Sequence, residues 1–367
     1  MSLAGRCIAH INLAAGFRGG ERQTELLLRY LAEAGWQQLL VARGGDSLAS
    51  RCADIPGLDI NEVSGGILSA SSAFDDAALI HVHQGRAIKA AWLQSFFGGK
   101  PYIVTRRVHK SPRQNPLNRS AYHRASRVIS ISMAISDSLH RLDPTLNVQL
   151  IPDCSSALRA SQQRSVLIRK TLGIDHKAFV VGHVGALVDS HKGQQQIIEM
   201  ARKSISIAPD VLYLLIGGGR DEQSLRHQAS GLSNIRFTGH VDNVGDYLNV
   251  LNLFLYPSRQ QGFDSVLLDA LEFGLPVVAI RVGGIPEIIE DGVNGFLFEV
   301  NDTRAMLKAI LRLRDDLKLA AAIGEENKRA AEAYTPAKMS KCYELIYQNV
   351  LDSRIKCSET NGWSASA

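Results

Sequence analysis

Glycine-rich segments follow three of the short apolar runs in this chain, and each precedes an amphipathic stretch. The first reads AGFRGGE at residues 15–21, the second covers 185–193 and includes Lys192, and the third is 217–219. Glycine lets backbone N–H groups approach a ligand closely, and a helix N-terminus favours an anion. A lysine adds a full positive charge. We therefore expect Gly19, Gly20 and Lys192 to bind a diphosphate, although a plain strand–helix turn also explains the first segment, which lacks a Walker Gly-Lys-Ser/Thr.

The most densely patterned segment is 257–279, which reads PSRQQGFDSVLLDALEFGLPVVA. Its first part is a loop that enters a helix near Ser265, and the helix leads directly into an apolar strand. Gly283-Gly284 and the run from Asp291 to Gly295 follow it. A ligand held at the start of that helix would meet its first backbone amides.

These segments need a scaffold of alternating strands and helices, and the remaining sequence provides one. Short apolar runs alternate with amphipathic stretches, a pattern typical of βαβ units and a parallel sheet. Strands are expected near residues 7–12, 38–42, 78–83, 102–105, 127–131, 148–151, 179–185, 211–216, 235–239, 253–256, 276–280 and 295–298. Helices are expected near 20–34, 86–97, 133–142, 194–207, 220–229, 244–250, 265–273, 303–313 and 336–351.

A chain of 367 residues is long enough for two domains. Pro152 ends a predicted strand, and the polar segment 153–163 is the candidate linker. We predict an N-terminal Rossmann-like domain over 1–155, a second one over 165–335, and a helix over 336–352 that packs back on the first domain. The fold class is therefore α/β, with two Rossmann-like domains facing a cleft. Ligands of such sheets lie beyond the carboxyl ends of the strands.

Composition narrows the setting of the protein. No apolar run approaches the roughly 18 residues of a membrane span, and no signal peptide is apparent. Five scattered cysteines without a CxxC pair argue against a zinc site and a disulfide framework, so we expect a cytoplasmic location. No Asp-x-Asp motif occurs, and no metal-bridged diphosphate is expected. His81 and His83 share one face of a predicted strand, where lining the cleft is favoured over binding a metal.

The net charge is +5, and its distribution is uneven. No Asp or Glu lies between Asp76 and Asp137, whereas that stretch holds ten basic residues: Arg86, Lys89, Lys100, Arg106, Arg107, Lys110, Arg113, Arg119, Arg124 and Arg127. Such a stretch concentrates anions, and it suggests a phosphorylated or otherwise anionic acceptor or an anionic membrane surface. A solvated face without function is the alternative. Few aromatic residues are interspersed, so nucleic acid is not expected as a partner.

Segment 257–287 resembles the signature of glycosyltransferase family 4, the retaining enzymes of GT-B fold. Their pattern is Pro-Ser, Glu-Gly-Phe, a helix ending in Glu-Ala, Gly-x-Pro-Val-Val-Ala and Gly-Gly-x-x-Glu. The resemblance extends from about residue 180 to 300, and it continues more faintly in the first domain at Gly19-Gly20, His83 and 105–109. It implies transfer of a sugar from a nucleotide-sugar donor, UDP-linked and without a further cofactor, to an anionic glycan or lipid-linked acceptor.

The resemblance also implies roles for individual residues. Lys192, with Gly19 and Gly20, would bind the donor diphosphate, and Val241 would hold the base through its backbone. Asp269 would bind the ribose hydroxyls, and Gln261 the donor sugar. The loop amides of Phe263, Asp264 and Ser265 would approach sugar and phosphate, and His109 would lie near the reacting sugar. The family manages without a carboxylate nucleophile, so the resemblance assigns catalysis to Lys192, Gln261 and His109.

The chain departs from the family pattern at several positions. Gln261 and Asp269 stand where glutamates are usual, Ala186 stands where an arginine is common, and Asp153-Cys154 follows Pro152 where Asn-Gly is frequent. These changes leave a catalytically weakened nucleotide-sugar binding module as an alternative. A nicotinamide-dependent oxidoreductase is disfavoured because no complete Gly-x-Gly-x-x-Gly turn is present. The basic stretch further suggests an acceptor from bacterial lipopolysaccharide or surface polysaccharide synthesis, with possible enzyme contact at the inner face of the cell membrane.

Overall fold

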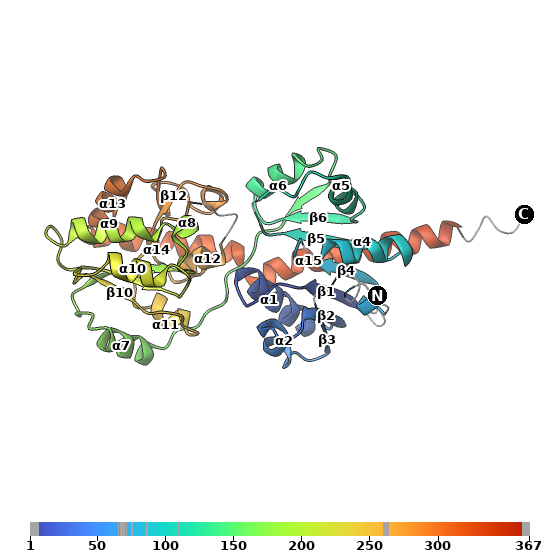
Figure 1. Ribbon diagram of the computed structural model, residues 1–367, viewed down its shortest axis with the longest axis horizontal. Coiled ribbons are helices and arrows are strands. Elements are labelled where there is room, and N and C mark those ends of the chain that lie inside the picture. Colours follow the sequence, from blue (N-terminus) through green and yellow to red (C-terminus); the bar gives the residue numbers. More distant parts are fainter. Residues whose placement is uncertain are drawn as a thin grey trace, which may run out of the picture. The chain divides into compact units, whose positions relative to one another are not determined.

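The computed structural model describes residues 7–64, 66, 70, 72–74, 76–85, 87–108, 110–259 and 264–361. The chain divides into two compact units, the first formed by 1–154 with 336–367 and the second by 155–335. Each unit is a parallel sheet with helices arranged around its strands (Figure 1). The predicted α/β class with two Rossmann-like sheets is confirmed.

The first unit contains a seven-stranded sheet of order β3-β2-β1-β4-β5-β6-β7. Its elements are β1 (Ile8–Asn12), α1 (Gly19–Glu33), β2 (Gln38–Arg43), α2 (Ser47–Cys52), β3 (Leu58–Val63), η1 (Ser72–Phe74), β4 (Leu79–Val82), α4 (Ile88–Phe97), β5 (Tyr102–Arg106), α5 (Pro116–His123), β6 (Arg127–Ser130), α6 (Met133–His140), β7 (Val148–Leu150) and α15 (Pro336–Asn361). All neighbouring strands run parallel.

The long C-terminal helix α15 completes the core of this unit. Tyr343 and Tyr347 are fully buried against Ile8 of β1 and the apolar face of α1. Trp36 donates from its indole Nε1 to Glu344 at 2.9 Å, which fixes the helix where its surface becomes polar. The burial of two tyrosine rings at about 25 cal/mol per Å² explains why a segment so distant in sequence belongs to this unit.

The second unit contains a six-stranded sheet of order β10-β9-β8-β11-β12-β13. Its elements are α7 (Gln162–Thr171), β8 (Phe179–Val184), α8 (Asp189–Lys192), α9 (Gln194–Ser204), β9 (Val211–Ile216), α10 (Glu222–Gln228), β10 (Ile235–Phe237), α11 (Val244–Leu248), β11 (Leu253–Tyr256), α12 (Ser265–Glu272), β12 (Val277–Ile280), η2 (Ile285–Glu287), β13 (Gly295–Phe298), α13 (Thr303–Asp315), α14 (Leu317–Ala331) and η3 (Glu332–Tyr334).

The sheet orders locate the two points where ligands of parallel sheets usually bind. In the first unit the strand order reverses between β1 and β4, and in the second between β8 and β11. At such a point the chain leaves the two adjacent strands in opposite directions, so the loops at their carboxyl ends diverge and leave room for a ligand. The loops after β1 and β8 are the glycine-rich segments that the sequence singled out.

Several elements differ from the prediction. No apolar run predicted β3, in which only Val63 is buried, and α2, α5, α7 and α14 were not predicted either. The boundary between the two units, after residue 154, lies within the predicted linker 153–163, although residues 153–156 are buried and α7 begins at Gln162. No helix in the described ranges is long and apolar enough to cross a bilayer.

Candidate active site

Lys192 lies at the reversal point of the second sheet because the backbone around it bends sharply. It ends the short helix α8, and Gly193 follows with φ of +70°. A Cβ at position 193 would lie 2.3 Å from the carbonyl oxygen of Pro257, which follows β11. Only glycine therefore lets the loop after β8 lie against the chain that leaves β11.

Three polar side chains converge there. Lys192 Nζ donates to Asp264 Oδ2 at 2.6 Å and lies 3.4 Å from the hydroxyl of Tyr256. The same hydroxyl donates to Asp264 in a short hydrogen bond. The side chains of Lys192 and Asp264 are only 15% and 21% exposed, so solvent screens the pair weakly. We refer to Lys192, Tyr256 and Asp264 as the lysine cluster.

The protonation of this cluster follows from its contacts. Burial by itself would raise the pKa of Asp264, but the charge and hydrogen bond of Lys192 bring that pKa below its usual value. Burial and the nearby Asp264 carboxylate raise the pKa of Tyr256 well above 10. Tyr256 is therefore a neutral donor and Asp264 a carboxylate at neutral pH. An ammonium group has three protons, so Lys192 keeps donor capacity for a ligand beside Asp264.

Asp269 has a different environment from the one expected. It is 3% exposed, and its carboxylate accepts from the backbone N–H of Ser156 at 2.5 Å and from the Ser156 hydroxyl at 2.9 Å. These bonds fix the start of the second unit to α12. A carboxylate has about four acceptor positions, so a ribose contact is compatible with this geometry, and the predicted role stays a prediction.

Other predicted donor-site residues lie at the same edge of the second sheet. Ser265 is the first residue of α12, where its N–H has no partner within the helix, and Asp264 is the N-cap. Val241 lies half-buried in the loop between β10 and α11. Gln261, Phe263 and His109 lie outside the described residues, and their predicted roles remain predictions.

The glycine loop of the first unit is held by side chains from β1 and α1. Gly16 has φ of +77°, and its N–H donates to Asp46 Oδ1 at 2.9 Å. Asn12 accepts from the N–H of Ala14 and donates to Thr24 on α1. The helix then starts at Gly19, so the N–H groups of Gly19 and Gly20 are among those without intrahelical partners.

Arg107 is a candidate that the sequence grouped only with the surface arginines. Its side chain is 8% exposed, and its Nε donates to Asp153 at 2.9 Å. It packs beside the glycine loop, since a Cβ at Gly20 would lie 3.8 Å from Arg107 Cδ. Its second terminal nitrogen is buried without a hydrogen-bond partner. A buried arginine next to a glycine-rich helix start could have been proposed from Thr105-Arg106-Arg107 following a strand.

Three buried histidines lie next to Arg107 and take part in a hydrogen-bonded network. The guanidinium of Arg107 can only donate, so His83 accepts at Nδ1 over 3.4 Å and donates from Nε2 to His10 Nδ1 at 3.0 Å. His81 bonds to Tyr347 and Thr105. Burial lowers the pKa of all three, to about 3 for His10.

Their ligating atoms all lie within 4.8 Å of one another, which a metal site requires. However, the nitrogens of His81 and His83 bind these partners, and a guanidinium lies next to the cluster. The contacts therefore favour a neutral network that positions Arg107. The expectation that His83 lines a binding site fits poorly with its burial at 4% exposure.

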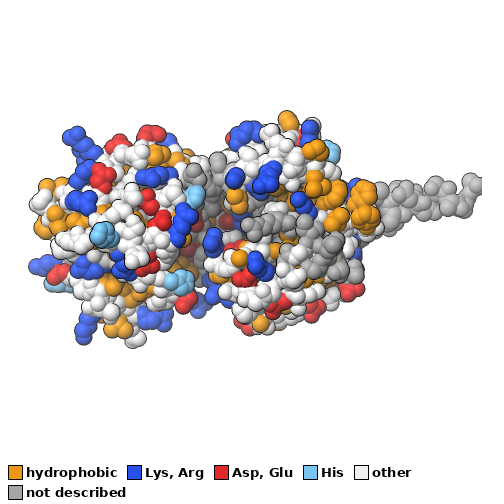
Figure 2. All heavy atoms as spheres, viewed as in Figure 1, with side chains coloured by type: hydrophobic (Ala, Val, Ile, Leu, Met, Phe, Trp, Pro, Cys, Tyr) orange, Lys and Arg blue, Asp and Glu red, His pale blue; other side chains and the backbone are white. Residues whose placement is uncertain are grey.

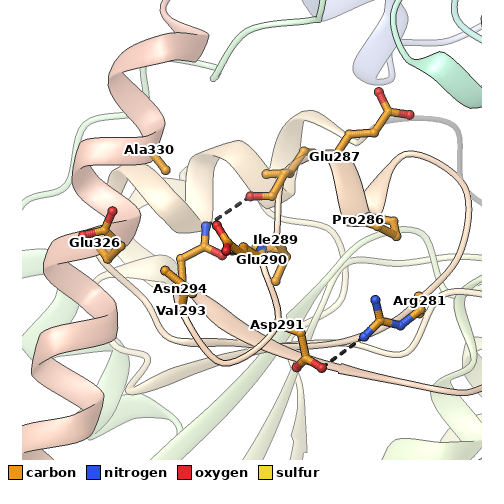
Figure 3. A pocket seen from close by; sticks show the side chains of 11 residues that line it. Arg281, Pro286, Glu287, Ile289, Glu290, Asp291, Val293, Asn294, Glu326 and Ala330 are labelled. Carbon is orange, nitrogen blue, oxygen red and sulfur yellow. Dashed lines mark hydrogen bonds and ion pairs between the residues drawn. The ribbon is translucent and has the colours of Figure 1, made fainter.

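A cavity of about 510 Å³ in the second unit contains none of the predicted site residues (Figure 3). It is lined by Glu287, Glu290, Asp291 and Glu326, with Arg281 paired to Asp291 at 3.0 Å. Asn294 donates to the carbonyl of Ile288 beside it. Four carboxylates against one arginine disfavour a phosphate ligand, so this cavity is not the diphosphate site.

Part of the second unit and much of the whole chain are similar in sequence to known glycosyltransferases. Residues 178–316 match the family model described as glycosyl transferases group 1. The N-acetyl-alpha-D-glucosaminyl L-malate synthase of Bacillus anthracis is 27% identical over 288 residues, which are 74% of this chain and 75% of that protein. The lipopolysaccharide core biosynthesis mannosyltransferase LpsB of Rhizobium meliloti is 27% identical over 194 residues, and the matched region covers 50% of this chain and 55% of LpsB.

Solved structures show the same fold. HepE of Anabaena in complex with UDP superposes with a TM-score of 0.81 at 20% identity, covering 94% of this chain and all of that one. The fold, the matched family model and the glycine and lysine motifs at the sheet reversals agree with one another. Residues 178–316 form a group 1 glycosyltransferase domain, and this chain is a glycosyltransferase of GT-B fold that resembles glycosyltransferase family 4.

Proposed function

We propose that this protein transfers a sugar, with retention of anomeric configuration, from a UDP-linked donor to a glycan or lipid-linked acceptor of bacterial lipopolysaccharide or surface polysaccharide synthesis. The observation that carries the proposal is the lysine cluster at the β8/β11 reversal. There an ammonium group is held by Asp264 beside the start of α12. The matched family model covers this region.

The lysine cluster supports stabilisation of a departing nucleoside diphosphate. Asp264 accepts a hydrogen bond from one N–H of Lys192 and holds the ammonium in place, while the N–H that Asp264 and Tyr256 do not use can bind a phosphate oxygen. Negative charge grows on those oxygens as the bond to the sugar breaks. A donor aligned beforehand then stabilises the transition state more than the ground state. The amides of Gly19 and Gly20 are proposed as further donors to the same group.

We propose retention because the chain resembles retaining enzymes and because the carboxylates at the site already bind other residues. Asp264 bonds to Lys192 and Tyr256, and Asp269 bonds to Ser156, so we assign both carboxylates positioning roles and neither the role of nucleophile. A mechanism in which the acceptor attacks on the face that the diphosphate leaves requires no protein nucleophile. It requires alignment of the acceptor hydroxyl with the donor.

The acceptor class is proposed from charge and from relatives. The acid-free stretch leaves Lys110 and Arg113 exposed, which fits an anionic acceptor. The stretch is not one open surface, because Arg107 is buried and Arg119 donates to Asp143 at 3.0 Å. LpsB, named for lipopolysaccharide core biosynthesis, is consistent with this class.

The proposal is tested by incubating the protein with UDP-, GDP- and ADP-sugars, with and without core oligosaccharide acceptors. We expect UDP release that depends on the acceptor, and a product whose anomeric proton coupling by NMR matches that of the donor. Arg113→Glu should raise the KM for an anionic acceptor and leave donor hydrolysis unchanged. Donor binding without nucleotide release under any acceptor would instead support a weakened binding module. An inverted product would contradict retention.

A further inference from the structure

Exposed apolar side chains of the first unit gather in the part of the chain that lacks acidic residues. Among its described residues, five of the seven large hydrophobic side chains that are exposed lie within 77–136, and the set comprises Phe96, Phe97, Val108, Leu117 and Met133. Phe96 is 58% exposed and Phe97 is 81% exposed. Two adjacent phenylalanines this exposed are costly in water.

Where α4 contacts α5, exposed aromatic side chains lie next to basic ones. Lys89, Trp92 and Phe96 share one face of α4 at helical spacing. Trp92 Nε1 donates to Ser120 on α5 at 3.3 Å, and the rings of Trp92, Phe96 and Phe97 contact in sequence.

Arg124 joins the two helices from the other side. Its guanidinium donates to the carbonyl of Ser95 at 2.9 Å and lies 5.5 Å from the ring centre of Phe96. Leu117, Ser120 and Arg124 follow one another on the same side of α5. We call Lys89, Trp92, Phe96, Phe97, Leu117 and Arg124 the α4–α5 patch. Figure 2 shows hydrophobic and basic side chains adjacent to each other over this part of the first unit.

We propose that the α4–α5 patch docks the protein on an anionic phospholipid surface. Phe96 and Phe97 would enter the boundary between headgroups and acyl chains, and Trp92 would lie at headgroup level, where indole rings are favoured. Lys89 and Arg124 would contact lipid phosphates, and no acidic residue between positions 77 and 136 opposes them. Phe97, at the end of α4, projects furthest into solvent.

Charge decides between a membrane and a protein occupant. Arginine and aromatic side chains occur at protein interfaces as well, whereas lysine is depleted there. Here Lys89 lies on the same face of α4 as Trp92 and Phe96, and residues 77–136 contain no Asp or Glu. Each basic residue near an anionic membrane surface contributes favourably, and the contribution is lost with salt. This inference rests on the surface of the first unit and does not depend on which sugar is transferred.

Vesicle flotation of the full chain tests the proposal. We expect the protein to float with phosphatidylcholine vesicles containing about one third phosphatidylglycerol, but not with pure phosphatidylcholine. Raising NaCl from about 50 to about 500 mM should release it. Phe96→Ser/Phe97→Ser should weaken partitioning about tenfold or more. Lys89→Glu, which reverses one charge of the patch, should weaken it to a smaller extent.

The matched control is Val166→Ser/Leu167→Ser, which removes two similarly exposed aliphatic side chains from α7 in the second unit. There Arg164 is paired with Asp246, and Arg169 bonds to backbone carbonyls. We expect this variant to float like the wild type. Equal loss in both variants, or full binding by Phe96→Ser/Phe97→Ser, overturns the proposal.

A change of oligomeric state in Phe96→Ser/Phe97→Ser without vesicle binding by the wild type would assign the patch to a protein contact and also overturn the proposal. Donor hydrolysis in solution is measured for each variant. A variant that still hydrolyses the donor but no longer floats shows that the patch acts independently of the proposed sugar transfer. Absence of donor hydrolysis by the wild type would contradict only the proposed sugar transfer.

Discussion

Lys192 donates a 2.6 Å hydrogen bond to Asp264, a residue 72 positions later in the chain. The contact joins the loop after β8 to the start of α12 across the reversal point of the second sheet. It holds the ammonium group in place before a donor binds, so less entropy is lost when a diphosphate arrives. We therefore propose Lys192 as a preorganised phosphate ligand.

Removal of the ammonium group should slow sugar transfer. Lys192→Ala is expected to lower kcat by about 100-fold, because a donor aimed at the developing charge is lost. The control is Lys203→Ala, which removes an exposed lysine paired with Glu199 on α9. Initial rates of UDP release under saturating donor give the comparison, and unchanged kcat in Lys192→Ala contradicts the assignment.

Neutralising Asp264 should destabilise the protein in a pH-dependent manner. Asp264→Asn is expected to cost about 2 kcal/mol at pH 7, the scale of a hydrogen bond to a charged group. The pKa of Asp264 is lowered on folding, so its stabilisation is present above the unfolded pKa near 4 and is lost as the pH falls through the folded pKa. Urea unfolding of both proteins between pH 3 and 7 measures the difference, which should narrow only below about pH 4.

The buried pair of Arg107 and Asp153 should be strongly coupled. Both side chains are less than a tenth exposed, so Arg107→Leu removes the positive charge that compensates a buried carboxylate. The expected loss is about 3–5 kcal/mol of unfolding free energy. The double variant Arg107→Leu/Asp153→Leu should recover most of it, and exposed Arg113→Leu should cost almost nothing. Additive effects in this double-mutant cycle would argue against the pair.

The histidine network should make the first unit sensitive to acid. Folding holds His10, His81 and His83 neutral by lowering their pKa values, so the unfolded state binds more protons below about pH 6.5. Stability is therefore retained above that pH and falls as the pH decreases, by up to about 1.4 kcal/mol per pH unit for each histidine. Melting temperatures across pH 4–8 should show this slope. His10→Gln should reduce this pH dependence by the contribution of one histidine, whereas exposed His176→Gln should leave the pH dependence unchanged.

Two variants distinguish a structural role of Asp269 from a role in binding the ribose. Ser156→Ala removes the 2.9 Å hydroxyl bond and should cost about 1 kcal/mol of stability without changing UDP affinity. Asp269→Asn should weaken UDP about tenfold if the carboxylate also binds the ribose. Affinity for 2′,3′-dideoxy-UDP should then be the same in wild type and Asp269→Asn. Equal weakening of both ligands would indicate a purely structural residue.

The strands that carry the site could be predicted from sequence, because they are buried on both faces. β11 matches its predicted bounds, β1 and β8 differ from theirs by one residue, and the glycines around Lys192 and Gly20 indicated both loops. β3 was missed because its side chains are largely exposed, so the apolar run that identifies a buried strand is absent. α5 and α7 were missed because their apolar faces are short and mostly exposed.

Side-chain partners could not be predicted in the same way. The pairing of Lys192 with Asp264 and of Arg107 with Asp153 joins residues that only the folded sheets bring together. No local period in the sequence encodes such contacts. Arg107 was counted with the surface cations because composition alone does not distinguish a buried arginine from an exposed one. The polar segment 153–163 was interpreted as a linker and contains the boundary between the units, but the burial of residues 153–156 depends on partners far away in sequence and could not be predicted.

The central claim is that Lys192 binds the diphosphate of the donor, and calorimetric titration with UDP tests it most directly. We predict that UDP binds the wild type and that Lys192→Ala weakens it at least about tenfold, the scale of one charge-assisted contact. Uridine, which has no phosphate, should bind both proteins equally. UDP affinity that is the same in the wild type and Lys192→Ala would contradict the account.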